Sequence, residues 1–377
     1  MERIFELCNG DRLTCTEQAA IFRFSGPRMV LSTGANGGGM RDDLTCAFNY
    51  CDCGTAGICQ PMEGNNLREH QRAVARRLGL DPDHTTGLDT AANLDNMVVI
   101  TKRWEDLQIT AAVSGGADVN ALCAGDPAFL TEADGMPCPV PPGTINIFLI
   151  TDRALAPGAM AELMLTATEA KTAVLRALMQ GSSVSQELAT GTGTDGMVVI
   201  CGMGEGERLL NAGKHFKFGE LAALAVREAV TEALFRQTRF CAQEQHSVFK
   251  RLRRFGITAD RLSSRCLAQL PGRRAALART LDKLDQDAFF VGAVALYVHL
   301  EDQRRAGMLT ELEVRDWAEH LLQQIQRHYH CDLPIRQEAG LMEKLEHFLC
   351  EMLVINLREQ ERLYPNTASV SSGEERT

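Results

Sequence analysis

The first 240 residues mix two hydrophobic periods, one typical of strands and one typical of helices. Short runs rich in β-branched and aromatic residues predict strands at 28–33, 44–50, 97–101, 107–113, 143–151 and 194–201. The polar segment 102–106 is short enough to predict a hairpin between the third and fourth of these strands. Apolar residues at helical spacing predict helices at 66–78, 158–179 and 217–238.

A hairpin beside strand–helix units indicates how these elements are layered. A purely parallel wound sheet contains no hairpins, because parallel strands need long crossover connections. The N-terminal region is therefore predicted to be α+β, with a mixed β-sheet and helices packed on it.

The pattern changes near Cys241, where strand signals end and charged helical patterns take over. Thr310 and Glu313 have the spacing of a capping box, Gly307 ends the helix before it, and 341–364 predicts a last amphipathic helix. We expect a first domain over 1–240, an all-helical region over 241–365 and a disordered tail over 366–377.

Composition and charge favour a two-domain globular protein and argue against nucleic acid binding and membrane-spanning classes. The chain has 377 residues, 45% of them hydrophobic, which suits two domains with sizeable cores. A net charge of −10 argues against nucleic acid binding, which needs a basic face. No signal peptide follows Met1, and the longest apolar run, 288–300, is shorter than the roughly 20 residues that span a bilayer. We expect a cytoplasmic protein without a membrane partner.

Thirteen cysteines are many for such a chain. In the cytoplasm they are expected to be reduced thiols or metal ligands rather than disulfides. Four of them cluster at Cys46, Cys51, Cys53 and Cys59, with a spacing that matches no standard zinc or iron–sulfur pattern. A metal site and a set of free thiols both remain open for this cluster.

Four polar, glycine-bearing segments each lie beside a predicted strand. They are 31–39, 114–121, 143–146 and 190–195. Each alone is typical of a turn, but four at strand ends in one domain favour a shared ligand cleft. The segment 190–195 adds three threonine hydroxyls, two glycines that allow close approach to the backbone, and the carboxylate of Asp195 as a charge or general base.

Two further segments carry titratable groups. Glu169 lies in the predicted helix 158–179, on the side away from its apolar stripe. His215 precedes the predicted helix 217–238, where the helix dipole favours the neutral, basic form of an imidazole. The alternatives, a solvated acidic residue and a surface histidine, stay open on spacing alone.

In this order the segments resemble the adenosylcobinamide amidohydrolase family, which acts in corrinoid salvage. The matching residues are Leu31–Thr33, Gly37, Gly38, Asn49, Asn120, Ala121, Gly125–Pro127, Gly143–Ile147, Thr168–Thr172, Ala189–Asp195, Gly213–His215 and Gly219–Leu221. Together they cover roughly residues 25 to 240. One departure is Phe216, which stands where the family pattern has serine.

The resemblance implies hydrolysis of the amide that joins aminopropanol to the corrin ring in adenosylcobinamide. The products are adenosylcobyric acid and 1-amino-2-propanol, and some relatives also act on pseudocobalamin-type corrinoids. No cofactor or metal is implied, because the cobalt arrives with the substrate. The catalytic candidates are Glu169, Lys171, Asp195 and His215. The predicted substrate-binding residues are Ser32, Thr33, Asn36, Gly37, Gly38, Asn49, Asn120, Thr144, Asn146, Thr190, Gly191, Thr192, Gly193, Thr194 and Lys214.

Several mechanisms fit these candidates. Glu169 or Asp195 activates a water, the segment 190–194 holds the oxyanion, and Lys171 or His215 protonates the amine. Alternatively, Thr192 or Thr194 attacks the amide covalently, with Lys171 or His215 as the adjacent base. A different class of function is a non-catalytic corrinoid-binding regulator or carrier whose helical region binds a partner. A different large amide as substrate is a further alternative, and the C-terminal helices are expected to form an oligomer contact or a lid.

Overall fold

A computed structural model describes residues 2–53, 61–128, 142–204, 207–336 and 340–363. The chain divides into two compact units, Met1–Glu244 and Gln245–Thr377, and each is described here by itself. The division falls four residues after the end of the predicted first domain. The predicted disordered tail lies outside the described residues.

The first unit contains a five-stranded sheet, sheet A, with the order β1-β2-β3-β6-β7. Its strands are Arg3–Glu6, Arg12–Cys15, Ala19–Arg23, Cys46–Cys51 and Thr85–Thr90. All neighbours are antiparallel except β6 and β7, which are parallel. The prediction of β6 is confirmed, but β7 was missed because Gly87 and Asp89 interrupt its apolar pattern. Gly87 is required there, since an added Cβ would lie 2.1 Å from the ring of Phe48.

A second, six-stranded sheet, sheet B, has the order β5-β4-β13-β11-β9-β8. Its strands are Gly39–Arg41, Arg28–Ser32, Gly196–Gly202, Ile145–Ile150, Leu107–Gly115 and Val98–Trp104. The pair β11 and β13 is parallel and the other pairs are antiparallel, so the sheet is mixed. The hairpin is confirmed, but β8 continues to Trp104 and pairs with Leu107, because its outer face is exposed and tolerates polar residues.

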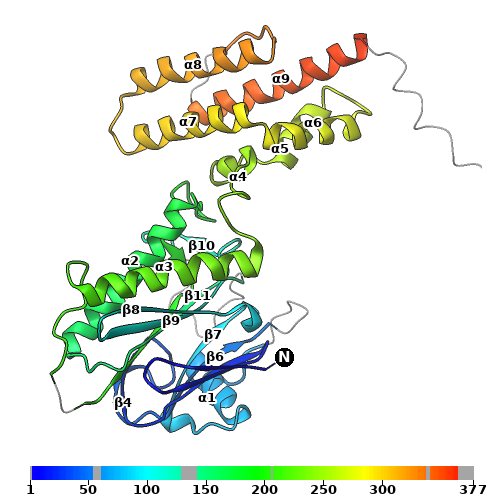
Figure 1. The fold of residues 1–377 in the computed structure, drawn as a ribbon. Coiled ribbons are helices and arrows are strands. Elements are labelled where there is room, and N and C mark those ends of the chain that lie inside the picture. The colour runs from blue at the N-terminus through cyan, green and yellow to red at the C-terminus, as the bar shows by residue number, and fades with distance from the viewer. Residues whose placement is uncertain (1, 54–60, 129–141, 205–206, 337–339, 364–377) are drawn as a thin grey trace, which may run out of the picture. The chain divides into compact units, whose positions relative to one another are not determined.

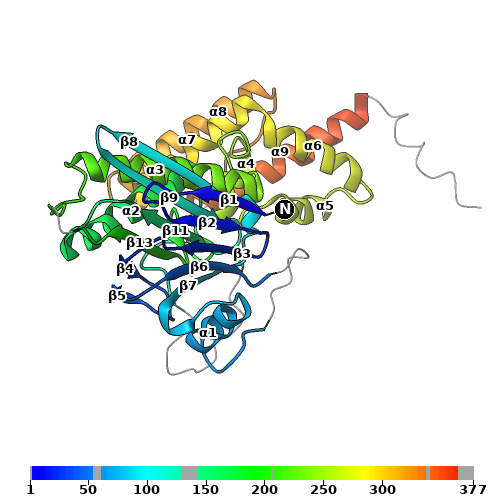
Figure 2. The same ribbon diagram turned by 60° about the horizontal axis from the view of Figure 1, so that its bottom comes forward.

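The two sheets and three helices form four layers. The helices α2 (Pro157–Ala177) and α3 (Lys217–Thr238) cover the outer face of sheet B, and α1 (Leu67–Arg77) covers sheet A (Figures 1 and 2). Between the sheets, the rings of Phe22 and Phe148 stack with centroids 4.3 Å apart. The α+β prediction, with helices packed on mixed sheet, is confirmed.

The central strand β11 shows why its sequence is almost continuously apolar. Ile147 and Leu149 pack towards the helices, while Phe148 and Ile150 pack towards sheet A. Both faces of the strand are buried, so alternation with polar residues disappears. Asn146 is the exception, and it lies at the end of the strand where the polar segments gather.

Short elements complete the first unit. They are the 3-10 helices Pro82–His84 and Leu94–Asn96 and the two-stranded sheet of β10 (Ala121–Leu122) and β12 (Gly191–Thr192). The pairing of β10 with β12 joins two of the polar segments that the sequence placed 70 residues apart.

The described residues of the second unit form helices joined by short connections, and no strand is found among them. Its elements are α4 (Val248–Leu252), a 3-10 turn (Arg253–Phe255), α5 (Ala259–Leu267), α6 (Arg274–Gln286), α7 (Ala288–Arg305), α8 (Glu311–His328) and α9 (Leu341–Leu363). The capping box is confirmed, since the Glu313 backbone N–H donates to the Thr310 hydroxyl and the Thr310 N–H donates to the Glu313 carboxylate. In the part of the chain that is described, no helix is long and apolar enough to cross a membrane.

Phe216, which stands where the family pattern has serine, changes the start of α3. Phe216 is the N-cap of α3, 46% exposed, and provides no capping hydrogen bond. Thr310 and Ser247 show what a hydroxyl does in the same position, because each accepts from the backbone N–H three residues later.

We therefore expect Phe216→Ser to raise the free energy of unfolding by about 0.5–2 kcal/mol. Urea unfolding of the full chain measures the change. Phe216→Ala is the matched control, since it removes the same ring without adding a cap. Equal stability of the two variants would contradict the capping argument.

Candidate functional site

The carboxylate of Asp195 joins three elements of the first unit. Its Oδ2 accepts from the Lys171 ammonium of α2 and from the Thr192 backbone N–H at 3.0 Å. Its Oδ1 accepts from the Thr192 hydroxyl at 2.5 Å and from the Ile145 N–H, at the start of β11, at 3.0 Å. The side chains of Lys171 and Asp195 are only 8% and 17% exposed. A buried pair of this kind needs its other hydrogen bonds satisfied, and four donors achieve that here.

Gly191 makes room for this ion pair. A Cβ at that position would lie 2.3 Å from Asp195 Oδ2 and 2.8 Å from Lys171 Nζ. Close approach of a ligand to this glycine stays a prediction. The groups that approach are the protein's own side chains.

Hydroxyl groups hold the rest of the segment 190–195 in place. The Thr144 hydroxyl donates to the Thr194 carbonyl oxygen at 2.7 Å, and the Thr194 hydroxyl donates to the Gly143 carbonyl oxygen at 3.0 Å. On the other side, the Thr172 hydroxyl donates to the Thr190 carbonyl oxygen at 2.7 Å. The segment is thus fixed between β11 and α2.

Most backbone N–H groups of this segment are already used. The N–H of Thr190 donates to Leu122, that of Thr192 to Asp195, and that of Gly193 to the Asn120 carbonyl oxygen. An oxyanion held by these groups stays a prediction, and it requires them to exchange partners.

Glu169 lies apart from this group. It forms an ion pair with Lys214, and both side chains are more than half exposed. Residues two apart on a helix point about 200° away from each other, which explains why Glu169 and Lys171 have different partners. His215 is exposed in the segment before α3. The structure therefore contains two ion pairs where the sequence suggested one group of four residues.

The four predicted asparagines are all buried. Asn146 Nδ2 donates to Asn49 Oδ1 at 2.9 Å and to the Asp89 carbonyl oxygen at 2.8 Å, and Asn49 Nδ2 donates to Ser114 Oγ at 2.8 Å. These bonds connect sheet A with sheet B. Asn146 Oδ1 is buried without a partner.

The other two asparagines also bond within the protein. Asn36 Nδ2 donates to the carbonyl oxygens of Pro82 and Thr85 at 2.9 and 2.8 Å. Asn120 Nδ2 donates to the Gly143 carbonyl oxygen at 2.8 Å. Recognition of corrin amides by these four side chains stays a prediction. In the structure their amides hydrogen bond to backbone carbonyl oxygens and to other buried side chains.

The first polar segment follows β4 and packs on β7. The hydroxyls of Ser32 and Thr86 are hydrogen bonded at 2.7 Å, and the Thr33 hydroxyl accepts from the Met197 N–H at 2.9 Å. Thr33 and Gly38 are exposed, whereas Gly37 is half-buried. Segments from 31–39, 120–122, 143–146 and 190–195 thus meet around the start of β13. A ligand cleft among them stays a prediction.

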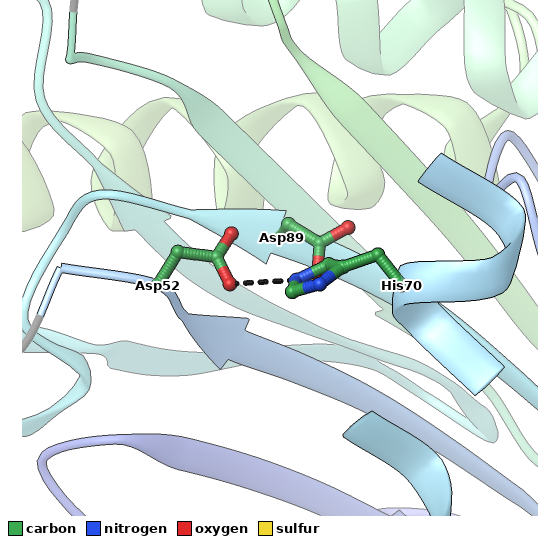
Figure 3. A group of neighbouring side chains, drawn as sticks. All are labelled: Asp52, His70 and Asp89. Atoms are coloured by element: carbon green, nitrogen blue, oxygen red, sulfur yellow. Dashed lines mark hydrogen bonds and ion pairs between the residues drawn. The ribbon is translucent and has the colours of Figure 1, made fainter. Parts of the chain in front are cut away.

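A second polar group was missed in the sequence: Asp52 directly after β6, His70 in α1 and Asp89 in β7 (Figure 3). His70 Nε2 lies 2.9 Å from Asp52 Oδ1 and 3.9 Å from Asp89 Oδ1. Because β6 and β7 are parallel, their carboxyl ends meet at one edge of sheet A, and α1 connects them. A strand predicted at 85–90 would have placed both aspartates at that edge.

The hydrogen bonds of His70 define its tautomer. The Glu63 backbone N–H donates to His70 Nδ1 at 3.0 Å, so this nitrogen carries no proton. The ring proton is therefore on Nε2, and it is donated to Asp52. Nε2 is a donor in this arrangement and offers no lone pair.

Burial raises the pKa of Asp89 to about 7, and the negative charge of Asp52 adds to the effect. A hydrogen bond from Gln71 Nε2 to Asp89 Oδ2 at 2.6 Å opposes the shift only in part. Asp89 Oδ1 is buried and has no hydrogen-bond partner.

The cysteine predictions are corrected at one position. Cys53 is disulfide-bonded, so it is neither a free thiol nor a metal ligand. Cys46 and Cys51 are free and buried, and the Cys51 thiol donates to the Cys53 carbonyl oxygen at 2.9 Å. Cys59 lies outside the described residues. Cys46 packs on the α1 side of sheet A and Cys51 packs between the two sheets, so the two thiols lie in different apolar cores.

Comparison with known families defines the class of protein. Residues 4–242 match the family model described as adenosylcobinamide amidohydrolase. The chain belongs to this family, and the first unit carries the match.

Two curated proteins are similar in sequence to the chain. The chain is 38% identical over 184 residues to an uncharacterised protein of Methanocaldococcus jannaschii, covering 46% of this chain and 71% of that protein. It is 34% identical over 130 residues to an adenosylcobinamide amidohydrolase of Halobacterium salinarum, covering 33% of this chain and only half of that protein.

One solved structure is a distant match. The PH0078 protein of Pyrococcus horikoshii is 12% identical, with a TM-score of 0.25, covering 63% of this chain and 86% of that one.

We expect Gly191→Ala to lower the free energy of unfolding by about 1–3 kcal/mol, because the new methyl group displaces the buried carboxylate or ammonium. Urea unfolding tests this. Gly158→Ala is the control, since an added Cβ there meets nothing within 4 Å. An unchanged midpoint for Gly191→Ala would contradict the close approach.

Asp89→Asn is expected to change the pH dependence of stability. An unfolded aspartate titrates near 3.9, whereas folded Asp89 titrates at about 7. Ionisation therefore costs the folded state free energy as pH rises from about 4 to about 7, with Asp52 and His70 as the facing titratable groups.

The variant should be more stable than the wild type by about 1–3 kcal/mol at pH 8 and nearly equal to it at about pH 3.5, below both pKa values. Urea unfolding in buffer with a chelator measures both values. A difference that stays constant with pH would contradict the raised pKa.

Proposed function

We propose that the first unit hydrolyses the amide between aminopropanol and the corrin ring of adenosylcobinamide. The products are adenosylcobyric acid and 1-amino-2-propanol. The family match supports the substrate class, and the buried arrangement of Lys171, Asp195 and Thr192 carries the proposal. The Lys171–Asp195 ion pair orients the half-exposed hydroxyl of Thr192, and packing of an apolar core does not require such an arrangement.

Amide hydrolysis needs a nucleophile, a base that takes its proton and an acid that protonates the amine. Thr192 is the nucleophile that the contacts favour. Its hydroxyl is hydrogen bonded to Asp195 Oδ1, and the ammonium of Lys171 pairs with Oδ2 and orients that carboxylate. Glu169, in contrast, is paired with Lys214 on the surface.

We propose that hydrolysis proceeds through an ester on Thr192. Thr192 Oγ1 attacks the carbonyl carbon while its proton passes to Asp195. The carbon–nitrogen bond then breaks, the proton goes to the leaving amine, and an ester remains on Thr192. Water hydrolyses this ester, giving the corrin carboxylate and restoring the hydroxyl.

The exposed groups around this centre provide room for a large substrate. Thr33, Gly38 and Thr194 are exposed at the meeting point of the segments, and Lys214 and His215 lie on the exposed segment before α3. We assign these groups to the periphery of the corrin. No cofactor beyond the substrate's own cobalt is proposed. Salvage or remodelling of cobalamin in the cytoplasm, with activity on pseudocobalamin-type corrinoids, is the biological setting that we propose.

The direct test incubates the purified full chain with adenosylcobinamide and detects products by mass spectrometry. We expect 1-amino-2-propanol together with a corrinoid that has gained one carboxylate. Binding of an intact corrinoid would instead favour a carrier or regulator. Neither binding nor cleavage would exclude this corrinoid as the ligand.

Substitutions separate the two nucleophiles. Thr192→Val and Asp195→Asn should each lower turnover by at least about 100-fold, while Thr192→Ser keeps measurable turnover. Glu169→Gln is the matched control and should lie within about threefold of the wild type, since its partner Lys214 is exposed. Full activity of Thr192→Val with loss in Glu169→Gln would establish the water-activation route instead.

A further inference from the structure

The group of Asp52, His70 and Asp89 has no part in the proposed hydrolysis. Asp52 follows β6, Asp89 lies near the end of β7, and His70 reaches over from α1 (Figure 3). One candidate ligand atom from each residue lies within 4.8 Å of the other two. Three segments distant in sequence thus converge at one edge of sheet A.

Asp52 Oδ1 accepts from His70 Nε2 and Asp89 Oδ2 accepts from Gln71 Nε2, but the other oxygen of Asp89 has no such contact. Asp89 Oδ1 is buried without any hydrogen-bond partner, 3.9 Å from His70 Nε2. A buried carboxylate oxygen without a partner is costly, and a bound cation is one way to remove that cost.

The tautomer of His70 determines which atoms of this group can bind a metal ion. The Glu63 N–H occupies Nδ1, so Nε2 carries the proton and donates it to Asp52 Oδ1. A metal ion on Nε2 would need the proton on Nδ1, where it would face another N–H donor. The imidazole therefore orients Asp52 and leaves oxygen atoms as the donors.

We propose that Asp52 and Asp89 bind a hard divalent cation, Mg²⁺ or its analogue Mn²⁺, through their carboxylate oxygens, with His70 as a positioning residue. Two carboxylates with water in the remaining positions are the donor set typical of Mg²⁺ in proteins. A nitrogen-preferring ion such as Zn²⁺ fits less well. The bound ion would tie α1 to the carboxyl ends of β6 and β7, independently of the proposed hydrolysis.

Electron paramagnetic resonance of Mn²⁺ added to the full, chelator-treated chain tests the proposal. The wild type should bind one Mn²⁺ that Mg²⁺ displaces, and Asp89→Asn should lose that ion. Asp83→Asn is the matched control, because Asp83 is an exposed aspartate beside the same helix. Equal Mn²⁺ binding by the wild type and Asp89→Asn would overturn the site.

A second variant tests the role of His70. His70→Gln keeps a side-chain donor for Asp52 but has no ring nitrogen, so Mn²⁺ affinity should fall by no more than about tenfold. Binding of Zn²⁺ without Mn²⁺, lost in His70→Gln, would show ligation by nitrogen and overturn the oxygen-donor assignment. Thermal unfolding with MgCl₂ gives a second readout, since the wild type should shift upward and Asp89→Asn should not.

Discussion

The buried ion pair of Lys171 and Asp195 is the interaction on which the polar centre of the first unit depends. It crosses from the middle of α2 to the residue before β13, and the same carboxylate accepts from the backbone of Ile145 in β11. Removing one partner would leave an uncompensated charge between layers, which is far more costly than losing a surface pair. The glycine at 191 and the threonines around it follow from this constraint.

Two kinds of polar contact therefore coexist in one four-layer unit. The side-chain amides of Asn49 and Asn146 are fully buried, and their hydrogen bond joins sheet A to sheet B. Thr192 is half-exposed and shares its hydroxyl with Asp195, so it combines a fixed orientation with access. That combination is why we propose Thr192, rather than either asparagine, as the reactive group, although all three residues look equally polar in the sequence.

The second polar group shows how parallel strands create sites that a sequence hides. Asp52 and Asp89 are 37 positions apart in the chain, yet the parallel pairing of β6 and β7 places both at one edge. The intervening α1 contributes His70 because a parallel pair requires a crossover connection. The resulting excess of negative charge is a property of the assembled edge and of none of its segments.

The sequence by itself determined the fold class, the family and most long elements, because helices such as α2 and buried strands such as β11 carry strong local periodicity. It also determined that the polar segments belong together, and it named Lys171, Thr192 and Asp195. Only the tertiary structure decided which of these residues contact one another. Glu169 lies on the surface and pairs with Lys214, whereas the four asparagines are buried. Only the tertiary structure showed that 85–90 forms the edge strand β7, and that Asp52, His70 and Asp89 lie together. The physical reason is that pairing between distant strands, burial and charge compensation are long-range quantities, whereas periodicity reports only the neighbours along the chain.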